Sequence, residues 1–453
     1  MVARTNTRRT LALLRAYESR NVTFQEPDGS WPIVWDRARG VHVWDAEGRK
    51  YLDLTAAFGV AAAGHANPRV VKAGQRQMAK LLHAMGDVHP HPLKARLARE
   101  LSRITFERWR SHSSGKAIFC NSGFEAVEAA LKTAMLATGK PGVIAFEGAY
   151  HGLGYGALNA THRGHFRGPF LSQLGQFGYF VPFPSVGQAS RPSLSKARDR
   201  ITDKLNGCFT VEKQIRRLLR AKKIGAILVE PIQVRGGINI PDPRFLPMLR
   251  RLCTEHGTLL ILDEIYTGFG RTGRWFACEH PAVVPDLICL GKALTGGFPL
   301  SACVGRADLM DAAWLPSTGE AIHTSTFLGH PVGCAMALAQ IRELSNRGLI
   351  ERSRRLGEHL SSLLFSHITQ TSTCSSRGLG LLAGVELLTS AGKPATDAAL
   401  TLIKRLLHQG YIFLPEGEHA NVISFTPPLT ISPRQLQDAV EALATVLDDL
   451  GCG

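Results

Sequence analysis

A chain of 453 residues, 44% of them hydrophobic, can bury a large core and form two or three domains, or one large domain with an appendage. Its formal net charge of +16 is spread along the chain and aromatic residues make up only 7%, which favours small anionic ligands over nucleic acid. No apolar run could cross a bilayer, and nine scattered cysteines without a CxxC pair indicate neither a metal site nor disulfides, so we expect a cytoplasmic protein.

The N-terminal part predicts a surface helix followed by a hairpin. The segment "TLALLRAYESR" has the pattern of an exposed helix, although its arginines would also suit an organelle transit peptide. In "GVHVWDAEGRKYLDLTAAFG", two strand-like runs meet at Gly48, which predicts a β-hairpin turning there.

From residue 116 onward, short apolar runs alternate with helical patterns. The predicted buried strands are "KAIF", "GVIAF", "GAILVEP", "TLLILDEI", "DLICL" and "SACVG". Such alternation indicates an α/β domain with a mostly parallel sheet that is covered on both faces. Polar residues follow these runs, and ligands of open α/β sheets bind beyond the carboxyl ends of the strands. Those positions are therefore the candidate site.

The chain has two further parts outside this core. Residues 185–213, which include "PSVGQASRPSLSKARD", have the polarity of an excursion from the sheet. A helical pattern in "GCAMALAQIRELSNRG" precedes the apolar runs "GLLAGVELL", "YIFLP" and "VISFTPPLT". These patterns predict a smaller α+β domain over about 335–453.

The segment "LILDEIYTGFGRTG" permits two interpretations. Gly268, Gly270 and Gly273 match the G-x-G-x-x-G loop of dinucleotide-binding proteins, which would indicate a nicotinamide-dependent oxidoreductase. That fingerprint needs a helix directly after the loop, and Pro281 and Pro285 interrupt the sequence there. The loop alone is therefore weak support for a dinucleotide site.

The same segment ends a predicted buried strand with Asp263 and Glu264. A buried carboxylate is costly unless a cation keeps it charged. That cation is either a structural ion-pair partner or the pyridinium ring of pyridoxal phosphate (PLP), an electron sink that a carboxylate keeps protonated. The second interpretation requires a lysine at a strand end, and Lys292 follows the apolar run 287–290. The glycines around it favour a Schiff-base lysine over an ordinary surface residue.

A phosphate-binding turn is predicted by "FCNSGFEAVEAALK". A strand leads through Ser122 and Gly123 into a helix beginning near Phe124, whose free N–H groups and dipole suit a dianion. The same residues also fit an ordinary N-capped helix with Glu125 completing a capping box, and both interpretations can hold together. After the next strand, "FEGAYHG" provides Tyr150 as an aromatic that could stack on the cofactor ring.

Six stretches occur along the chain in a consistent order: "NSGFEAVEAALK", "AYHG", "VEPIQ", "LILDEIYTGFGRTG", "GKALTGGFPLSA" and "HTSTFLGHPVGCAMALA". Together they resemble the class III PLP-dependent aminotransferases of fold type I, from about residue 28 to the C-terminus. The resemblance implies a large PLP-binding domain over 67–334 and a smaller domain built from both chain ends, 1–66 and 335–453. It also implies a homodimer, or a tetramer, with sites at the subunit interface.

The resemblance implies a role for each residue around the cofactor. Lys292 would form the Schiff base and shuttle the proton, while Asp263 would pair with the pyridine nitrogen. The other expected contacts are Ser122, Gly123 and the amide of Phe124 at the phosphate, Tyr150 and Ile265 on the two ring faces, His151 beside Tyr150, Gln233 near the ring hydroxyl, Glu230 in the adjacent loop and Thr326 at the phosphate of the neighbouring subunit. Phe124 departs from the family, which usually has a small hydroxyl residue there. In this interpretation Asp263 takes part in the chemistry, and the glycines of "GFGRTG" only shape a turn.

The substrate side departs further from the commoner family pattern. Many members carry a carboxylate-binding arginine where this chain has Ser424, and a glutamate counter-ion where it has Arg235. Our hypothesis is that Arg235 supplies the carboxylate-binding cation from the opposite wall of the pocket. The alternative is that Arg235 faces solvent and that the pocket prefers uncharged amines. We also expect Phe58 and Ser424 to border the substrate.

The resemblance implies transfer of an amino group from an amine or amino acid to a keto acid or aldehyde by a ping-pong mechanism. Aminomutases, racemases and a decarboxylating transaminase of the same fold type use the same lysine and aspartate, so the cofactor motifs do not separate them. A nicotinamide oxidoreductase and a non-catalytic binding protein are the alternatives from other classes, and the intact Lys292 and Asp263 argue against both. We expect no metal, nucleic-acid or membrane partner.

Overall fold

A seven-stranded sheet lies at the centre of the larger part of the molecule. The computed structural model describes residues 6–27, 29–109, 114–185, 197–368, 371 and 373–450. The strands follow one another across the sheet in the order β4 (Gly115–Cys120), β10 (Ser301–Arg306), β9 (Leu287–Leu290), β8 (Leu259–Asp263), β7 (Ile224–Val229), β5 (Gly142–Phe146) and β6 (Gly178–Val181). Strand β10 runs antiparallel to β4 and β9, and the other neighbouring strands pair in parallel. The predicted, mostly parallel sheet is confirmed.

Both faces of this sheet are buried. Successive residues of a strand point to opposite faces, and in β7 Ile227 and Val229 belong to one apolar cluster while Ala226 and Leu228 belong to another. The second cluster includes the alanines of α5 (Gly123–Thr138), whose small side chains let that helix pack closely on β9 and β10. The first cluster includes residues from helices on the other face: α4 (Pro92–Ile104), α9 (Phe245–His256) and α11 (Pro331–Asn346). Burial of both faces explains the near-continuous apolar runs of the strands.

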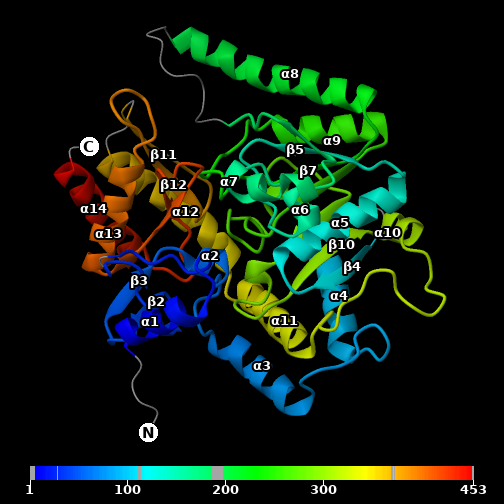
Figure 1. The fold of residues 1–453 in the computed structure, drawn as a ribbon, viewed down its shortest axis with the longest axis horizontal. Helices are drawn as coiled ribbons and strands as arrows, with labels where there is room; N and C mark the ends of the chain where they lie inside the picture. The colour runs from blue at the N-terminus through cyan, green and yellow to red at the C-terminus, as the bar shows by residue number, and fades with distance from the viewer. Residues whose placement is uncertain are drawn as a thin grey trace.

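Further helices lie outside this layer. Helix α3 (Pro68–Lys80) packs on α11, and α10 (Ala307–Ala313) packs on α5. Helix α8 (Ala197–Ala221) lies along α9 at the top of Figure 1. Two short helices, α6 (Tyr155–Leu158) and α7 (Gly164–Arg167), and a 3₁₀ turn, η1 (Gly168–Gln173), follow β5.

The two chain ends combine into a second part, which we call the small lobe (residues 35–53 and 349–450). Its first sheet joins β1 (Trp35–Arg39), β2 (His42–Asp45), β3 (Lys50–Asp53) and β13 (Tyr411–Ile412), with β3 and β13 parallel. Its second sheet has the order β11 (Cys374–Gly378), β12 (Ala383–Leu387), β15 (Val422–Phe425) and β14 (Leu414–Glu416). Helices α12 (Leu349–His367), α13 (Thr396–Gln409) and α14 (Pro433–Asp449) pack on these strands and on one another. Figure 1 shows the blue N-terminal strands beside the orange and red C-terminal elements.

The structure confirms most of the predicted elements and adds others. Helix α1 (Thr7–Tyr17) occupies the predicted surface helix, and Gly48 forms the turn between β2 and β3 with a φ of 89°. Strand β6 and helix α12 were not predicted. Of the expected excursion at 185–213, residues 186–196 lie outside the described residues and the remainder begins α8. Among the helices of the described residues, none is long and apolar enough to cross a membrane.

Candidate active site

Three segments that are far apart in the sequence meet at the carboxyl edge of the sheet. Strand β8 ends at Asp263, β9 is followed by Lys292, and β4 leads into the turn that begins α5. Strands β8 and β9 are parallel neighbours, with Asp263 opposite Cys289. Because β4, β8 and β9 run in the same direction, their following residues lie at one edge of the sheet, where open α/β sheets bind ligands.

Asp263 is buried, and both of its carboxylate oxygens are hydrogen-bonded. Oδ2 accepts from Nδ1 of His151 at 2.8 Å, and Oδ1 accepts the backbone N–H of Ile265 at 3.1 Å. Donors of this kind favour the charged form of a buried carboxylate. Nε2 of His151 is buried and has no partner among the described residues. The arrangement orients a carboxylate anion toward the strand-end edge.

Glu230 supports the loop that carries Tyr150 and His151. Its Oε1 accepts the backbone N–H of Tyr150 at 2.9 Å. Burial raises the pKa of Glu230 to about 7, with His151 acting in the opposite direction. Burial likewise raises the pKa of Tyr150. The ring of Tyr150 lies edge-on to Phe166, with their centroids 5.4 Å apart.

The amine of Lys292 lies 4.5 Å from the centroid of the Tyr266 ring. Within the described ranges, no carboxylate oxygen lies at ion-pair distance from it. Burial lowers the pKa of Lys292 below its ordinary value of 10.5, and the Asp263 carboxylate opposes that shift. A lowered pKa increases the fraction of neutral amine, which is the nucleophilic form. The backbone of Lys292 has a φ of 42°, a strained conformation of the kind found at functional sites.

The turn before α5 contains both bonded backbone N–H groups and a side-chain hydroxyl without a protein partner. The Glu125 carboxylate accepts the backbone N–H groups of Asn121 at 2.6 Å and Ser122 at 2.8 Å. Ser122 and Glu125 occupy capping-box positions, but the Ser122 hydroxyl makes no side-chain hydrogen bond to the helix. It is buried and unpartnered in the part of the chain that the structure describes. The first N–H groups of a helix also lack intrahelical partners. A free hydroxyl at a helix N-terminus suits a phosphate dianion.

Close packing around this turn explains its glycines. A β-carbon on Gly123 would come within 3.1 Å of the Ile265 side chain, which packs against the turn. A β-carbon on Gly152 would come within 2.3 Å of that of Phe124. The Phe124 side chain therefore supports the 152–154 loop and offers no hydroxyl to a ligand.

Gln233 and Ser424, both expected to lie near a ligand, form hydrogen bonds within the protein. Gln233 donates from Nε2 to the carbonyl of Glu147 at 2.8 Å and accepts from Asn239 at 3.1 Å, so its amide joins two loops. Ser424 lies in β15 and donates its hydroxyl to the carbonyl of Leu414 at 3.0 Å. The Ser424 proton is thus used inside the small lobe and leaves no cation at the position of the commoner arginine.

Thr326 lies exposed on the loop before α11. The hydroxyl of the preceding residue, Ser325, accepts from the side chain of Asn121 at 3.4 Å. This loop therefore borders the phosphate-binding turn of its own chain, while the Thr326 side chain is accessible from outside.

Three residues form what we call the substrate wall: Phe58, Arg235 and Glu416. Nη1 of Arg235 lies 2.9 Å from Oε2 of Glu416, and the two side chains are 27% and 1% exposed. Oε1 of Glu416 has no partner among the described residues. The guanidinium carbon of Arg235 lies 6.0 Å from the ring centroid of Phe58 and 5.8 Å from that of Tyr150. Arg235 is therefore partly buried and ion-paired with Glu416.

The sequence analysis did not identify Glu416 as a candidate site residue. Burial raises its pKa, and the charge of Arg235 opposes that shift. A usable signal was present, because Glu416 follows the apolar run "YIFLP". An acid that ends an apolar run is the criterion that selected Asp263.

The segment that carries Phe58 has a strained backbone. In α2 (Ala56–Gly59), the φ values of Ala56, Ala57 and Phe58 are 46°, 49° and 62°. Left-handed conformations are unfavourable for residues with a β-carbon and persist where the surroundings impose them. A β-carbon on Gly59 would come within 2.8 Å of the Tyr266 ring, so this loop rests on the ring that faces Lys292.

The glycine loop after β8 joins the two parts of the molecule. Arg271 is fully buried, and its Nη1 donates to the carbonyls of Leu381 and Pro427. The loop is followed by a single 3₁₀ turn, η2 (Ala277–Glu279), where a dinucleotide fingerprint would need a helix. The glycines therefore have a structural role here, and the oxidoreductase interpretation loses its basis.

Glu264, the second acid of the pair, serves the same loop. Its carboxylate accepts the backbone N–H groups of Ala277 at 2.9 Å and Cys278 at 2.8 Å. Burial raises the pKa of Glu264 to about 7, and these hydrogen bonds act against the shift. Of the two neighbouring acids, Asp263 faces the site and Glu264 holds the loop.

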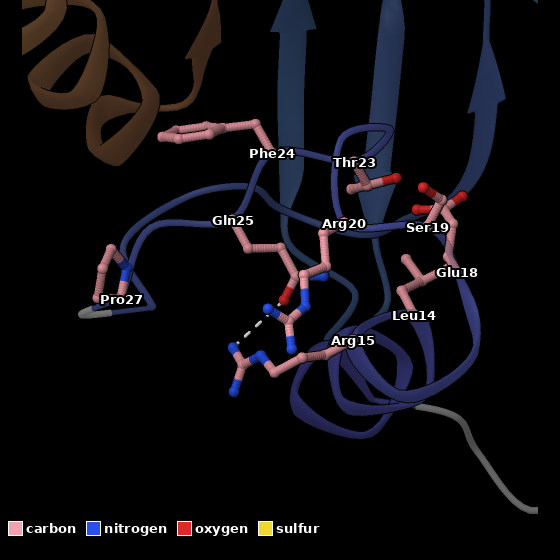
Figure 2. Close-up of a pocket in the computed structure, with 9 residues that line it drawn as sticks. All are labelled: Leu14, Arg15, Glu18, Ser19, Arg20, Thr23, Phe24, Gln25 and Pro27. Carbon is pink, nitrogen blue, oxygen red and sulfur yellow. Dashed lines mark hydrogen bonds between the residues drawn. The ribbon is translucent and has the colours of Figure 1, made fainter.

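An open pocket of about 580 Å³ in the N-terminal segment is separate from this chemistry (Figure 2). Figure 2 shows Arg15, Arg20 and Gln25 on one side of it, with Arg15 donating to Gln25 at 3.3 Å. None of the expected site residues lines it. A smaller, apolar crevice of about 250 Å³ includes Phe58 and Leu414 and thus borders the substrate wall.

The residues at the sheet edge fit PLP. We call Ser122, His151, Asp263 and Lys292 the cofactor wall. It combines an unpartnered buried hydroxyl at a helix N-terminus, a buried carboxylate held by two donors, and a lysine amine without a counter-ion. These are the groups required by a phosphate, a pyridinium nitrogen and an aldehyde.

Comparison with known proteins agrees with this chemistry. Residues 23–447 match the family model "Aminotransferase class-III". The chain is 36% identical to an acetylornithine aminotransferase of Methanosarcina mazei, with 92% of each chain covered. It is 35% identical to the 5-aminovalerate aminotransferase of Pseudomonas aeruginosa, with 92% of this chain and 94% of that one covered. A solved amine transaminase from an uncultivated Pseudomonas species, in its PLP-bound form, matches with a TM-score of 0.85 at 26% identity, over 96% of this chain and 98% of that one.

The family match covers nearly the whole chain, and the fold is that of fold type I enzymes. The chain belongs to the class III aminotransferases and is a PLP-dependent enzyme that transfers an amino group between small amines and carbonyl compounds.

Proposed function

We propose that Lys292 would hold the cofactor through its Nζ and that the same amine, once released, would remove a proton from the substrate carbon in one half-reaction and return one in the other. The observation that carries this proposal is the position of its amine, which lies 4.5 Å from the Tyr266 ring with a pKa lowered by burial. PLP, when bound, supplies an electron sink for the carbon that loses its proton. Asp263 would hold the ring nitrogen of that cofactor, since its carboxylate is oriented by hydrogen bonds from His151 and the N–H of Ile265.

The remaining cofactor contacts are proposed from the positions of the residues around the strand-end edge. Ser122, Gly123 and the amide of Phe124 bind the phosphate, supported by the free Ser122 hydroxyl. Tyr150 and Ile265 cover the two ring faces, and Gln233 and Glu230 hold the loops beside the ring.

We propose that the enzyme acts on amino acids and keto acids, with Arg235 binding a substrate carboxylate. The ion pair between Arg235 and Glu416 supports this role, because it demonstrates that a carboxylate fits beside the guanidinium group. Ser424 offers no charge that could replace Arg235. The names of the two relatives, which act on acetylornithine and 5-aminovalerate, are compatible with acidic substrates.

We propose a homodimer in which Thr326 of each copy reaches the phosphate in the other. Exposed apolar side chains support such an interface: Leu81, Leu82, Met85, Val88, Ile322 and Phe327. The two segments that carry them are joined by a hydrogen bond from Thr324 to Asp87 at 2.6 Å. A contiguous exposed apolar patch commonly marks a protein interface. A cytoplasmic location is supported by the thiols of Cys120, Cys253, Cys278, Cys289, Cys303 and Cys334, which are buried and form no disulfide.

The first experiment is the visible absorption spectrum of the purified protein with PLP, before and after addition of an amine donor. We expect a yellow band that the donor converts to the pyridoxamine form and that the Lys292→Ala variant lacks. Colourless wild-type protein, or a Lys292→Ala variant with an unchanged band, would remove the assignment of Lys292. Light scattering during size-exclusion chromatography tests the dimer, and a single-chain mass would contradict it.

A further inference from the structure

Arg163 is a second guanidinium group close to the substrate wall. It lies half-buried immediately before α7, and its Nη2 donates to the backbone carbonyl of Glu418 at 3.2 Å. Its Nε is buried without a partner among the described residues. Nor does any carboxylate of the described chain lie at ion-pair distance from it, whereas Arg235 is paired with Glu416. Arg163 is thus a partly desolvated cation that lacks a counter-ion.

The charges of Arg163, Arg235 and Glu416 act on one another. Burial lowers the pKa of Arg163, the positive charge of Arg235 lowers it further, and Glu416 acts in the opposite direction. Glu416 in turn uses Oε2 for Arg235 and leaves Oε1 without a partner. Glu416 is thus paired with Arg235 alone, and it acts on Arg163 only from beyond ion-pair distance, as Glu418 does.

Arg235 lies beside Tyr150, the ring proposed to cover one face of the cofactor, and Arg163 lies beside Phe166, which packs on Tyr150. The guanidinium carbon of Arg235 is 5.8 Å from the Tyr150 centroid. That of Arg163 is 5.2 Å from the ring of Phe166, whose centroid is 5.4 Å from that of Tyr150. Both arginines also contact the 416–418 segment, since Arg163 donates to the carbonyl of Glu418 and the carbonyl of Arg235 accepts the N–H of Gly417. A carboxylate bound between this segment and Tyr150 would have the two arginines on its border. Paired guanidinium forks are well suited to carboxylate oxygens.

We infer that Arg163 and Arg235 together form a carboxylate-binding subsite for an acidic amino acid or keto acid substrate, and that Glu416 is the internal carboxylate that this substrate displaces. The inference rests on the proposed function, in which Arg235 alone was assigned to the carboxylate. It adds a second specificity-determining arginine, Arg163, and an internal carboxylate, Glu416, that competes with the substrate carboxylate for the arginines. The two changes have opposite expected effects, because loss of Arg163 weakens acid binding and loss of the Glu416 charge strengthens it.

A purely structural role for Arg163 makes a different prediction. Arg163 bonds the carbonyl of Glu418, and the carbonyl of Arg235 accepts the N–H of Gly417 at 3.2 Å, so both arginines also contact the hairpin at 416–418. If Arg163 only fastens this hairpin, its loss should lower thermal stability and affect all substrates alike. The ratio of KM values for a charged and an uncharged substrate separates the two roles.

The test compares wild type with Arg163→Gln, Arg163→Lys, Arg235→Gln and Glu416→Gln, all loaded with PLP. Arg167→Gln is the matched control, because Arg167 also has a buried, unpartnered Nε and lies 4.7 Å from the Phe180 ring, yet only burial shifts its pKa. Half-reaction rates of the aminated enzyme are measured with 2-oxoglutarate, pyruvate and uncharged propanal. Calorimetric titration with glutarate, an unreactive dicarboxylate, measures binding independently of turnover.

We expect Arg163→Gln to raise the ratio of KM for the acid to KM for propanal at least tenfold, which corresponds to about 1.4 kcal/mol. Glutarate should bind correspondingly more weakly, Arg163→Lys should lie between the two, and Arg167→Gln should match wild type. Glu416→Gln should lower the same ratio. An effect confined to 2-oxoglutarate identifies a distal carboxylate, and an effect on pyruvate as well identifies the carboxylate next to the reacting carbon.

The outcomes separate the two proposals. If Arg235→Gln raises the ratio and both Arg163 variants leave it within about twofold, Arg163 is structural and this inference is overturned while the proposed function stands. If neither arginine affects the ratio, the assignment of Arg235 fails as well. A ratio that rises in Glu416→Gln contradicts the displacement of Glu416. If Arg163→Gln does not fold, Arg163→Lys still decides, because it retains the charge but loses the second N–H of the fork.

Discussion

The cofactor wall and the substrate wall neutralise their charges in different ways. In the cofactor wall, Asp263 receives its two hydrogen bonds from segments that follow β5 and β8, two strands of one sheet. In the substrate wall, Arg235 and Glu416 meet across 181 positions of the chain and belong to different parts of the molecule. The first carboxylate has both oxygens bonded, whereas the second keeps Oε1 unpartnered.

This difference matches two kinds of ligand. A cofactor that stays bound benefits from donors and acceptors that are already oriented, because no reorganisation is then needed during the reaction. A substrate that enters and leaves in every cycle needs a site whose internal partner can be exchanged. An ion pair between two separately folded segments can open without disturbing the sheet.

The strongest test of the cofactor wall exchanges one of its two neighbouring acids. Asp263→Asn removes a buried charge that is held by two donors, so kcat/KM should fall at least about a hundredfold, as expected for the breaking of a buried charge pair. The control, Glu264→Gln, disturbs only the loop bonded to Ala277 and Cys278. It should lower the melting temperature while kcat/KM per folded molecule stays within about threefold. Equal losses of activity in both variants would contradict the division of roles.

A pair of serines separates ligand binding from helix capping. Ser122→Ala removes a hydroxyl that has no protein partner, so the affinity for PLP should fall about tenfold with little change in the stability of the cofactor-free protein. Ser432→Ala removes a hydroxyl that accepts the N–H of Gln435 at 3.2 Å at the start of α14. It should cost about 1 kcal/mol of stability and leave PLP affinity unchanged. Titration with PLP measures the affinity, and urea denaturation measures the stability. A stability loss in Ser122→Ala would show that its hydroxyl stabilises the fold.

The lowered pKa of Lys292 predicts a pH dependence of stability in the cofactor-free protein. At pH values between the lowered pKa of Lys292 and its ordinary value of 10.5, Lys292 is protonated to a greater extent in the unfolded chain than in the folded chain. Stability therefore rises with pH across that window. Lys292→Met should remove this contribution, so the stability advantage of the variant should shrink as pH rises. Urea denaturation of both proteins at several pH values checks this, and a constant difference would refute it.

The smallest predicted effect concerns the strained loop of the substrate wall. Ala57 and Ala66 have φ values of 49° and 45°, and glycine adopts such angles without strain. Each Ala→Gly change should alter stability by less than about 1 kcal/mol, because relief of strain and the greater freedom of the unfolded chain oppose each other. Only Ala57→Gly should change KM, since it loosens the backbone beside Phe58. If Ala66→Gly changed KM equally, the strain at Ala57 would have no special relation to the substrate.

The cofactor wall was predictable from the sequence because its residues follow apolar runs. Asp263 and Lys292 each end such a run, and parallel strands bring their carboxyl ends to one edge. Ser122 carried a similar local signal, because it precedes a long amphipathic helix with Glu125 at the capping-box position. Local pattern and sheet topology together were enough to group these side chains.

The substrate wall was less predictable for physical reasons. The pairing of Arg235 with Glu416 depends on how the small lobe docks, which no local pattern encodes. The left-handed backbone at Phe58 has no signal in "LTAAFG", because nothing but tertiary packing forces such residues into that conformation. Strand β6 was missed because "GYFV" is short and follows a long irregular stretch. The domain boundaries at 67 and 335 remain predictions.

The pairing of β3 with β13 has a consequence for how the enzyme is made. Leu52 finds its partner only after Tyr411 has been synthesised, so the N-terminal hairpin emerges from the ribosome long before its neighbouring strand. The strands of the central sheet lie between them in the chain and can associate first, since domains generally begin to fold as they are synthesised. Contacts between distant segments are also the slowest to form. Glu416 follows β13 by a few residues, so the acid of the substrate wall takes its place only after all strands of the central sheet have been synthesised.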